Sequence, residues 1–591
     1  MPGFIAQIGN VVHENIFQHL PVPKKDKIND HLHCRDIYVE RLTINKFMDD
    51  KVFLSDDDFF ILVEGVVLNS RLLTSKYSQG TFKDCIIEMY KRNGETFFNE
   101  FRGSFCGIFC DKKSDLKLLF TDHIGSKQLF FANCGGGQFI LASDMLYMAE
   151  YFKYNNIPRN LDINGAYFLL TLGFMLEDST LFREIKKLLP GHYIKFQHNT
   201  CEIKRYYKLK FSYCCKLPQD EILEKLDKLF INAVYLAFEK DKQYGYKHIV
   251  NLSAGLDSRM TTFVANELGY GDDILNNTFS QTGCLDEAIP KQIASDLRHQ
   301  WLFKSLDNGI YLMDINKALK ITCGMSFFSG SSHTADYYDT FNFHNYGLVH
   351  SGQLGDAVVG SILQTNNSAT SQGYSVKSIS NSKFFDLNSK IQLNFQLLYD
   401  NEEEFKFFTR TFFGTNQGLL ASQRYTETYS PFYDIDFMEF CFSIPPEYRI
   451  GHKLYHKWIN LKHPAAANYV WERIGRKIND KSPKMITVLG RTVPLVKLPS
   501  RAYRYIYKRL RGKPFAEKLH MNPFHMNPFG YWYDTNDKLH AEINSYYKNN
   551  AGVLSQFPTL AQDCDELFKN GKVSEKAQVL TLVGMLKMYF S

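Results

Sequence analysis

The spacing of apolar and polar positions divides the chain into three regions. Up to about residue 210, short strand-like runs such as 191–196 predict an α+β sandwich of mostly antiparallel strands. The pattern then changes to a long helix, 219–240, followed by alternating strands and helices at 248–253, 257–269, 274–280, 286–298, 300–304 and 346–351. That alternation predicts an α/β doubly wound parallel sheet, which binds its ligand at the carboxyl ends of its strands. We therefore expect two domains and a C-terminal helical extension, at 1–210, 211–490 and 491–591.

The loop after the first strand of the predicted parallel sheet suits a polyanion. Residues 251–258 read Asn-Leu-Ser-Ala-Gly-Leu-Asp-Ser and precede a helix, whose first N–H groups and dipole favour negative charge. Ser253 and Ser258 add hydroxyl donors, Gly255 allows close backbone approach, and Asp257 can hold Mg²⁺ against phosphates. The loop lacks the lysine of a P-loop, which excludes ordinary kinases and GTPases and favours chemistry in which pyrophosphate leaves and AMP is transferred. A tight turn without a ligand is the alternative interpretation.

A second acidic loop follows a later strand of the same sheet. Residues 349–360 come after the strand signal 346–350 and place Asp356 between glycines at what should be the same sheet edge. Asp257 and Asp356 would then bracket one Mg²⁺, with the phosphates of ATP completing its coordination.

These motifs resemble two known protein families. The loop at 251–258 is similar to that of the N-type ATP pyrophosphatases, usually Ser-Gly-Gly-x-Asp-Ser, with Ala254 at the second position. Residues 349–360 are similar to Ser-Gly-Glu-Gly-Ser-Asp-Glu-x-x-Gly-Gly of the asparagine synthetase family. The order and spacing of later segments also match that family's Glu-x-Arg-x-Pro-Phe-Leu-Asp motif, proline-bearing segment and two-lysine helix, at 427–434, 443–446 and 453–457.

The resemblance implies a fold and specific roles. It implies an adenine nucleotide alpha hydrolase-like ATP pyrophosphatase fold that binds ATP and Mg²⁺, with adenosine near Leu252, Phe279 and Gly352. Lys457 falls on the family's active-site lysine, which would stabilise charge as AMP departs, and Glu427 would line the acyl pocket.

The first two hundred residues resemble the family's N-terminal-nucleophile glutaminase domain, in order along 41–44, 64–69, 102–109 and 121–131. That glutaminase needs an N-terminal cysteine, whereas this chain begins Met-Pro-Gly-Phe and its first cysteine is Cys34. Glu64 replaces the oxyanion-hole asparagine and offers an acceptor where a donor is required. Only Arg41 and Gly65 remain of the glutamine-binding set, so we expect no glutamine hydrolysis.

The expected activity is ATP-dependent amide formation. The carboxylate of a small molecule or peptide would form an acyl-adenylate, which free ammonia, ammonia from a separate protein or another amine would attack. Gln353 stands where ammonia-using synthetases carry a carboxylate, and an amide cannot act as that general base, which favours a different amine or acyl substrate. Relatives without glutaminase activity include β-lactam synthetases, macrolactam-forming cyclases and enzymes that amidate sugar acids.

Two other classes of function compete with this interpretation. Thiolases that modify tRNA share such loops, but the glutaminase-like half and the lack of a paired-cysteine signature argue against them. A non-catalytic scaffold is favoured by Ala254, by Gln353 and by the missing N-terminal cysteine.

The composition limits the partners and the cellular location that we expect for this protein. A net charge of +6 over 591 residues requires no nucleic acid or other polyanionic partner. No secretory signal is apparent, and the longest apolar run, 166–176, is broken by Gly173 and falls short of the roughly 18 residues of a membrane span. Twelve irregularly spaced cysteines fit reduced thiols, so we expect a cytoplasmic protein without integral membrane segments, and a homodimer is left open.

Overall fold

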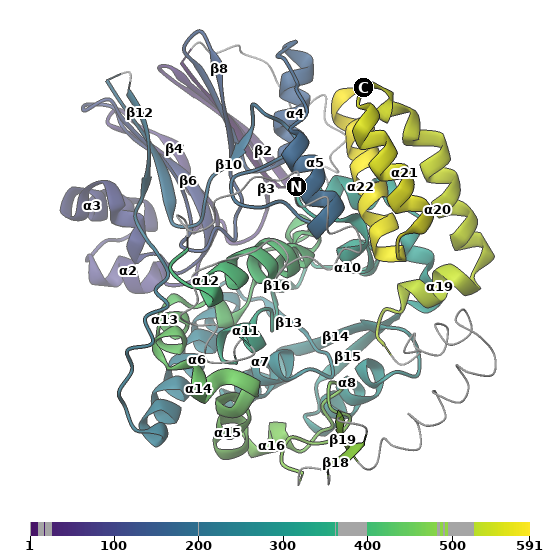
Figure 1. The fold of residues 1–591 in the computed structure, drawn as a ribbon. Coiled ribbons are helices and arrows are strands. Elements are labelled where there is room, and N and C mark those ends of the chain that lie inside the picture. The colour runs from purple at the N-terminus through teal and green to yellow at the C-terminus, as the bar shows by residue number, and fades with distance from the viewer. Residues whose placement is uncertain are drawn as a thin grey trace.

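The computed structural model describes residues 2–9, 17, 27–198, 200–360, 362–363, 399–480, 485–488, 491–494 and 525–591. Two antiparallel sheets lie side by side at the N-terminal end, a parallel sheet lies beneath them, and the C-terminal helices flank both parts (Figure 1).

The N-terminal region is the antiparallel sandwich that the sequence predicts. One sheet has the order β10-β8-β9-β1-β3-β2, formed by Lys186–Lys187, Phe130–Gly135, Gln138–Ala142, Gly3–Gly9, Ile37–Ile44 and Lys27–Cys34. The other has the order β12-β11-β7-β6-β5-β4, formed by Thr200–Arg205, His192–Gln197, Leu116–Thr121, Gly103–Asp111, Phe59–Val67 and Phe53–Ser55.

Strand β5 shows how one sequence serves both faces of its sheet. Successive side chains of a strand point to opposite faces. Phe60 and Leu62 enter the apolar layer that the two sheets share, whereas Ile61 and Val63 pack with helix α3 (Phe82–Asn93). The continuous apolar run therefore indicates a strand that is buried on both sides.

The second region contains the predicted parallel sheet. Its order is β15-β14-β13-β16-β17, with strands Gln300–Ser305, Ile274–Ser280, Lys247–Asn251, Tyr346–His350 and Thr428–Tyr429. The predicted strands and helices are confirmed within three residues, including α7 (Leu256–Glu267) and α8 (Leu285–Asp296). The edge strand β17 was not predicted, because two residues carry no readable alternation.

The order of the sheet creates a crevice. From β13 the chain winds outward to β14 and β15 on one side, and then returns to the other side as β16. The loops that follow β13 and β16 therefore diverge at the carboxyl ends of adjacent strands, where open α/β sheets bind ligands.

A buried polar cluster fastens helix α6 (Gln219–Gln243) to these two strands. Asp241 Oδ2 accepts hydrogen bonds from His248 Nδ1 at 2.9 Å and His350 Nε2 at 2.8 Å. The backbone N–H of Leu348 donates to Asp241 Oδ1 at 2.8 Å. Burial alone would raise the pKa of Asp241, but the His350 and His248 partners hold it below the usual range. The cluster therefore fixes β13 against β16 beneath the crevice.

The C-terminal region consists of α19 (Phe529–Thr535), α20 (Asp537–Asn550), α21 (Pro558–Asn570) and α22 (Val573–Phe590). Helix α22 is apolar around most of its circumference, as expected of a helix surrounded by protein. It packs on α5 (Ile163–Leu172) of the N-terminal region and on α9 (Ile315–Thr322), so this region ties the other two together. Within the described part of the chain, none of the helices combines the length and the apolar character that a membrane span requires.

Replacing Asp241 by Ala should lower the free energy of unfolding by about 3 kcal/mol or more, because two histidines and one N–H lose a common buried acceptor. Chemical denaturation measures the change. Asp220→Ala on the same helix is the control, since that side chain is 91% exposed, and should change stability by less than about 0.5 kcal/mol. Equal effects of the two substitutions would contradict this role for Asp241.

Candidate functional site

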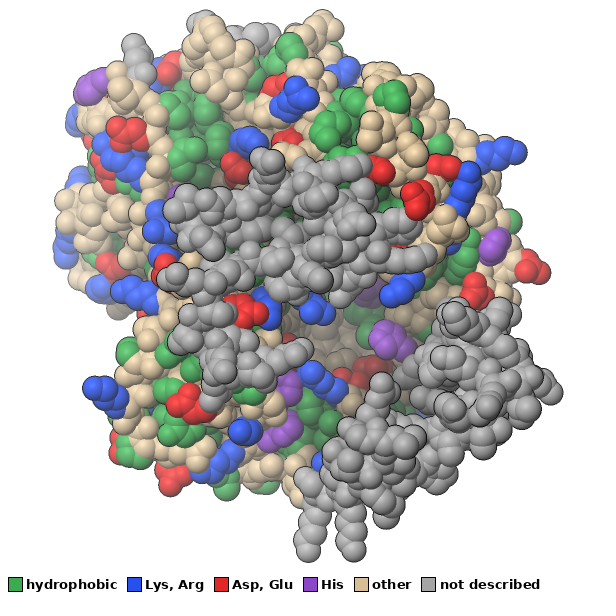
Figure 2. Space-filling model, viewed as in Figure 1, with side chains coloured by type: hydrophobic (Ala, Val, Ile, Leu, Met, Phe, Trp, Pro, Cys, Tyr) green, Lys and Arg blue, Asp and Glu red, His purple; other side chains and the backbone are tan. Residues whose placement is uncertain are grey.

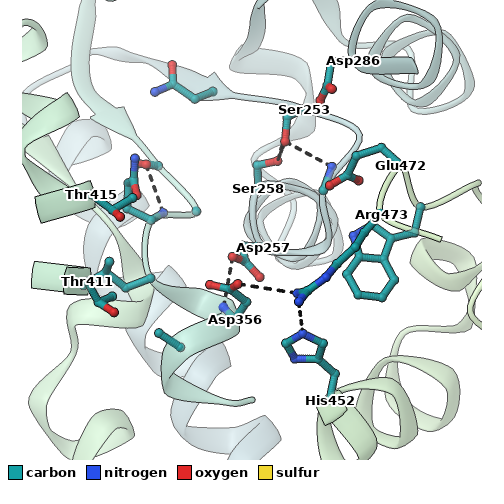
Figure 3. A pocket seen from close by; sticks show the side chains of 18 of the residues that line it. Ser253, Asp257, Ser258, Asp286, Asp356, Thr411, Thr415, His452, Glu472 and Arg473 are labelled. Atoms are coloured by element: carbon teal, nitrogen blue, oxygen red, sulfur yellow. Dashed lines mark hydrogen bonds and ion pairs between the residues drawn. The ribbon is translucent and has the colours of Figure 1, made fainter. Parts of the chain in front are cut away.

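The crevice opens into a cavity of about 1040 Å³ at the carboxyl ends of β13, β14 and β16. This volume lies at the upper end of the range for small-molecule sites and leaves room for more than one substrate. Figure 2 shows the hollow on this face, with basic, acidic and histidine side chains around it. Figure 3 shows the loop after β13 on one side and Thr411 and Thr415 on the other.

The loop after β13 forms one wall of the cavity, and hydrogen bonds within the loop and to α8 hold it in place. The Ser253 N–H donates to Ser258 Oγ at 3.0 Å, and the Gly255 N–H donates to Ser253 Oγ at 3.1 Å. The Ala254 N–H donates to Asp286 Oδ1 at 3.0 Å. Helix α7 starts at Leu256, so the N–H groups of its first turn have no acceptor within the helix and remain available to an anion.

Gly352 allows the loop after β16 to touch the first loop. A Cβ atom at this position would lie 2.2 Å from the Ser258 nitrogen and 2.5 Å from the Asp257 carbonyl carbon. Only glycine therefore fits where the two loops cross. Leu252, Phe279, Gly352 and Gln353 all line the cavity, as the motifs predict.

The structure brings Asp257 and Asp356 together. The Asp356 N–H donates to Asp257 Oδ2 at 3.0 Å, and the Tyr455 hydroxyl donates to Asp257 Oδ1 at 2.8 Å. Leu354 adopts a left-handed backbone with φ +70° before α11 (Gly355–Val358), a conformation that costs a non-glycine residue about 1 kcal/mol. Burial and the neighbouring Asp356 raise the pKa of Asp257 well above its usual range. A divalent cation would relieve this repulsion, and oxygen ligands of this kind fit Mg²⁺.

Sequence reasoning missed a basic side chain beside the aspartates. Arg473 Nη1 donates to His452 Nε2 at 2.7 Å and lies 4.0 Å from Asp356 Oδ2 (Figure 3). Burial lowers the pKa of the nearby His456 to about 4, so this imidazole is neutral. Arg473 is therefore the described cation closest to the acidic pair. It lies in an irregular segment, where a single arginine gives no sequence signal.

Lys457 is not at the cavity, contrary to the expectation. Its Nζ contacts Gln219 Oε1 at 2.7 Å and Asp220 Oδ1 at 3.4 Å on α6. Lys457 belongs to α15 (Lys453–Lys462), where one residue corresponds to a rotation of about 100°. The cavity side of that helix carries His456, and the next residue turns away.

Glu427 does not line the cavity either. Its carboxylate is buried against the N-terminal region, 3.0 Å from Lys51 Nζ and 2.6 Å from Lys127 Nζ. Burial alone would raise its pKa, but the charges of Lys127 and Lys51 lower it to about 2. The motif located Glu427 in the sequence, but its partners come from the other half of the chain.

The expected remnants of a glutamine site have structural partners. Arg41 donates to Asp30 Oδ2 at 2.6 Å. Glu64 Oε1 accepts from the Thr43 hydroxyl at 2.7 Å, and Gly65 adopts φ +107° where a Cβ would lie 2.2 Å from the Ser104 carbonyl oxygen.

Comparisons with known proteins agree with this geometry in the N-terminal half. Residues 40–207 match the family model of the glutamine amidotransferase domain. This region is therefore a glutamine amidotransferase-type domain, and the predicted resemblance to the asparagine synthetase-like family is confirmed there. The match begins after residue 39, so it does not test the expected loss of the N-terminal cysteine.

Two curated fungal proteins are similar to part of the chain. "Amidase chyE" of Penicillium rubens is 24% identical over 216 residues, which are 35% of this chain and 30% of that protein. "Amidase chry2" of Gibberella zeae is 23% identical over 202 residues, which are 33% of this chain and 28% of that protein. The chain thus matches less than a third of the length of these relatives.

Solved structures add no further argument. A glutamine phosphoribosylpyrophosphate amidotransferase from B. subtilis is 9% identical, with 52% of this chain and 91% of that chain covered, and its TM-score is 0.25.

Glu472 lies beside the loop after β13 and should make the affinity of this loop for anions depend on pH. Its carboxylate Oε1 would lie 3.9 Å from a Cβ at Gly255. Burial, followed by the charge of Asp286, raises the pKa of Glu472 to about 7, and the positive charge of Arg259 opposes the shift. The carboxylate therefore becomes charged beside the anion-binding loop as pH rises through neutrality.

We expect the affinity for Mg²⁺-pyrophosphate to fall about three- to tenfold more between pH 6 and pH 8 in the wild type than in Glu472→Gln, because only the wild type gains that charge. Calorimetric titration at both pH values measures it. The variant also controls for titration of pyrophosphate itself. Identical pH profiles for the two proteins would contradict the prediction.

Proposed function

We propose that this protein is an ATP-dependent amide-forming ligase that activates a carboxylate as an acyl-adenylate. The observation that carries the proposal is the meeting of Asp257 and Asp356 beside a helix N-terminus, at the crevice of a parallel sheet. The glutamine amidotransferase-type domain and the two amidases among the relatives support amide chemistry.

The cavity residues account for the first step. Adenosine would lie along Leu252, Phe279 and Gly352, with the pyrophosphate against Ser253, Gly255 and Ser258. Asp257 and Asp356 would hold Mg²⁺, which when bound neutralises charge on the phosphates. An oxygen of the substrate carboxylate attacks the α-phosphorus, the bond to the β-phosphate oxygen breaks, and pyrophosphate leaves.

In the second step an amine or ammonia attacks the acyl carbon, AMP leaves with the electron pair of the broken C–O bond, and the nitrogen gives up one proton to water. The guanidinium of Arg473, and not Lys457, would stabilise the charge that develops as AMP departs, because Arg473 lies in the cavity beside Asp356. Gln353 lines the same cavity but cannot accept the proton of the amine, so we assign it to substrate binding. A β-lactam or macrolactam cyclase and a sugar-acid amidotransferase fit this chemistry equally well.

A non-catalytic scaffold is the second candidate. One observation favours it: the N–H groups of Ser253, Ala254 and Gly255 already have acceptors within the protein. A ligand would have to displace these contacts or use the N–H groups of the first turn of α7.

An ¹⁸O-labelled carboxylate distinguishes the two candidates. The ligase transfers one ¹⁸O atom from the acid to AMP, whereas a scaffold forms no AMP. We expect Asp257→Asn to slow AMP formation at least about a hundredfold, because the metal loses a ligand. Lys457→Gln, in α15 and outside the cavity lining, should stay within about twofold of the wild type. Mass spectrometry of AMP, over a panel of candidate acids, gives both results. Unlabelled AMP would contradict the adenylation step.

We also propose that the N-terminal domain does not hydrolyse glutamine. Glu64 presents an acceptor that Thr43 already occupies, where the reaction needs a donor for the oxyanion. Pure protein incubated with glutamine, with and without ATP, should release no glutamate above the rate of a buffer control. Steady glutamate release above that control rate would contradict this.

A further inference from the structure

Four charged side chains form a closed cluster between the N-terminal domain and the parallel sheet. We call Lys51, Glu64, Lys127 and Glu427 the interdomain charge cluster. The first three belong to the N-terminal domain, and only Glu427 comes from the sheet. The side chains are 0%, 2%, 11% and 1% exposed.

The cluster contains two positive and two negative charges at short range. Lys51 Nζ lies 3.0 Å from Glu427 Oε1 and 3.6 Å from Glu64 Oε1, and Lys127 Nζ lies 2.6 Å from Glu427 Oε2. The same ion pairs raise the pKa of Lys127 despite its burial, so both partners stay charged. A buried carboxylate that loses a lysine is strongly destabilised, so Glu427 has one well-defined position.

The segment from Glu427 to Ser430 supports the cavity. The Val349 N–H donates to the Glu427 carbonyl oxygen at 2.9 Å, and the Ser351 N–H donates to the Tyr429 carbonyl oxygen at 2.9 Å. The Ser430 hydroxyl donates to the Gln353 carbonyl oxygen at 3.0 Å. These three bonds run along β16 into the loop that leads to Asp356.

Strand β17 can hold β16 and its loop in place only if another part of the protein anchors it. It has two residues, lies at the edge of the sheet and pairs only with β16 among the described strands. A strand this short is not stable through its own pairing. It also approaches β6 of the N-terminal domain, the neighbour of β5, which carries Glu64.

We infer that the N-terminal domain serves as a positioning element for the cavity: Lys51 and Lys127 hold Glu427, Glu427 holds β17, and β17 sets the loop from Ser351 to Asp356. Glu427 is a positioning residue, since it touches none of the groups that line the cavity through its side chain. The affinity readout below rests on the proposed function, whereas the exchange readout does not.

The experiment compares Glu427→Gln with Lys240→Met. Lys240 forms another buried ion pair across the same two regions, 3.1 Å from Asp50 Oδ2, but it contacts neither β17 nor the cavity. Hydrogen exchange is measured by mass spectrometry on peptides that span 347–354. Affinity is measured by calorimetry with Mg²⁺ and α,β-methylene-ATP, at a temperature where each variant is folded.

For Glu427→Gln we expect at least tenfold faster exchange in 347–354 and at least tenfold weaker affinity for the nucleotide analogue. Lys240→Met should lower the melting temperature but leave both readouts within twofold. Lys127→Arg keeps the charge and the ion pair, and should leave both readouts close to those of the wild type. If Glu427→Gln does not fold, Lys127→Met/Glu64→Gln removes one charge of each sign and should show the same two effects.

A variant of Glu427 that melts earlier but keeps both the exchange rate and the affinity overturns the inference, because the cluster would then only stabilise the fold. A wild type that does not bind the nucleotide analogue contradicts the proposed function instead. Exchange in 347–354 then still decides whether the N-terminal domain holds the loop.

Discussion

The repulsion between two carboxylates at one sheet edge is the constraint on which the rest of the structure depends. Asp257 and Asp356 follow different strands, lie 99 residues apart in the chain, and are joined by a hydrogen bond from the Asp356 N–H to Asp257. Burial near a like charge is costly unless a cation or proton neutralises it. Folding therefore has to hold the two loops together against this cost, which a divalent cation bound between them would relieve.

Three features of the fold supply that restraint. The order of the sheet places β13 beside β16, the Asp241 cluster fixes both strands from beneath, and Gly352 lets the two loops cross at contact distance. The interdomain charge cluster adds an anchor from the other half of the chain. The amidotransferase-type domain thus contributes directly to the packing that surrounds the cavity.

The sequence predicted the features that depend on local patterns. Short buried strands and the helices after them were placed within about two residues, because their apolar runs and loop residues are contiguous. The approach of Asp257 to Asp356 was predictable, since each follows a strand of one parallel sheet. The position of Lys457 was not, because one residue along a helix rotates the side chain by about 100° and only packing decides which face meets the cavity. Glu472 and Arg473 depend on partners that are distant in sequence, so no local signal identifies them. The motif that contains Glu427 gives no sign of its lysine partners, for the same reason.

The central claim is that one divalent cation joins both aspartates to a nucleotide. The most direct test is a crystal structure grown with Mn²⁺ and α,β-methylene-ATP, with anomalous diffraction used to locate the metal. The account predicts one anomalous peak between the Asp257 and Asp356 carboxylates, in contact with the phosphates at the loop after β13. A nucleotide bound in this cavity with its metal away from both aspartates would contradict it.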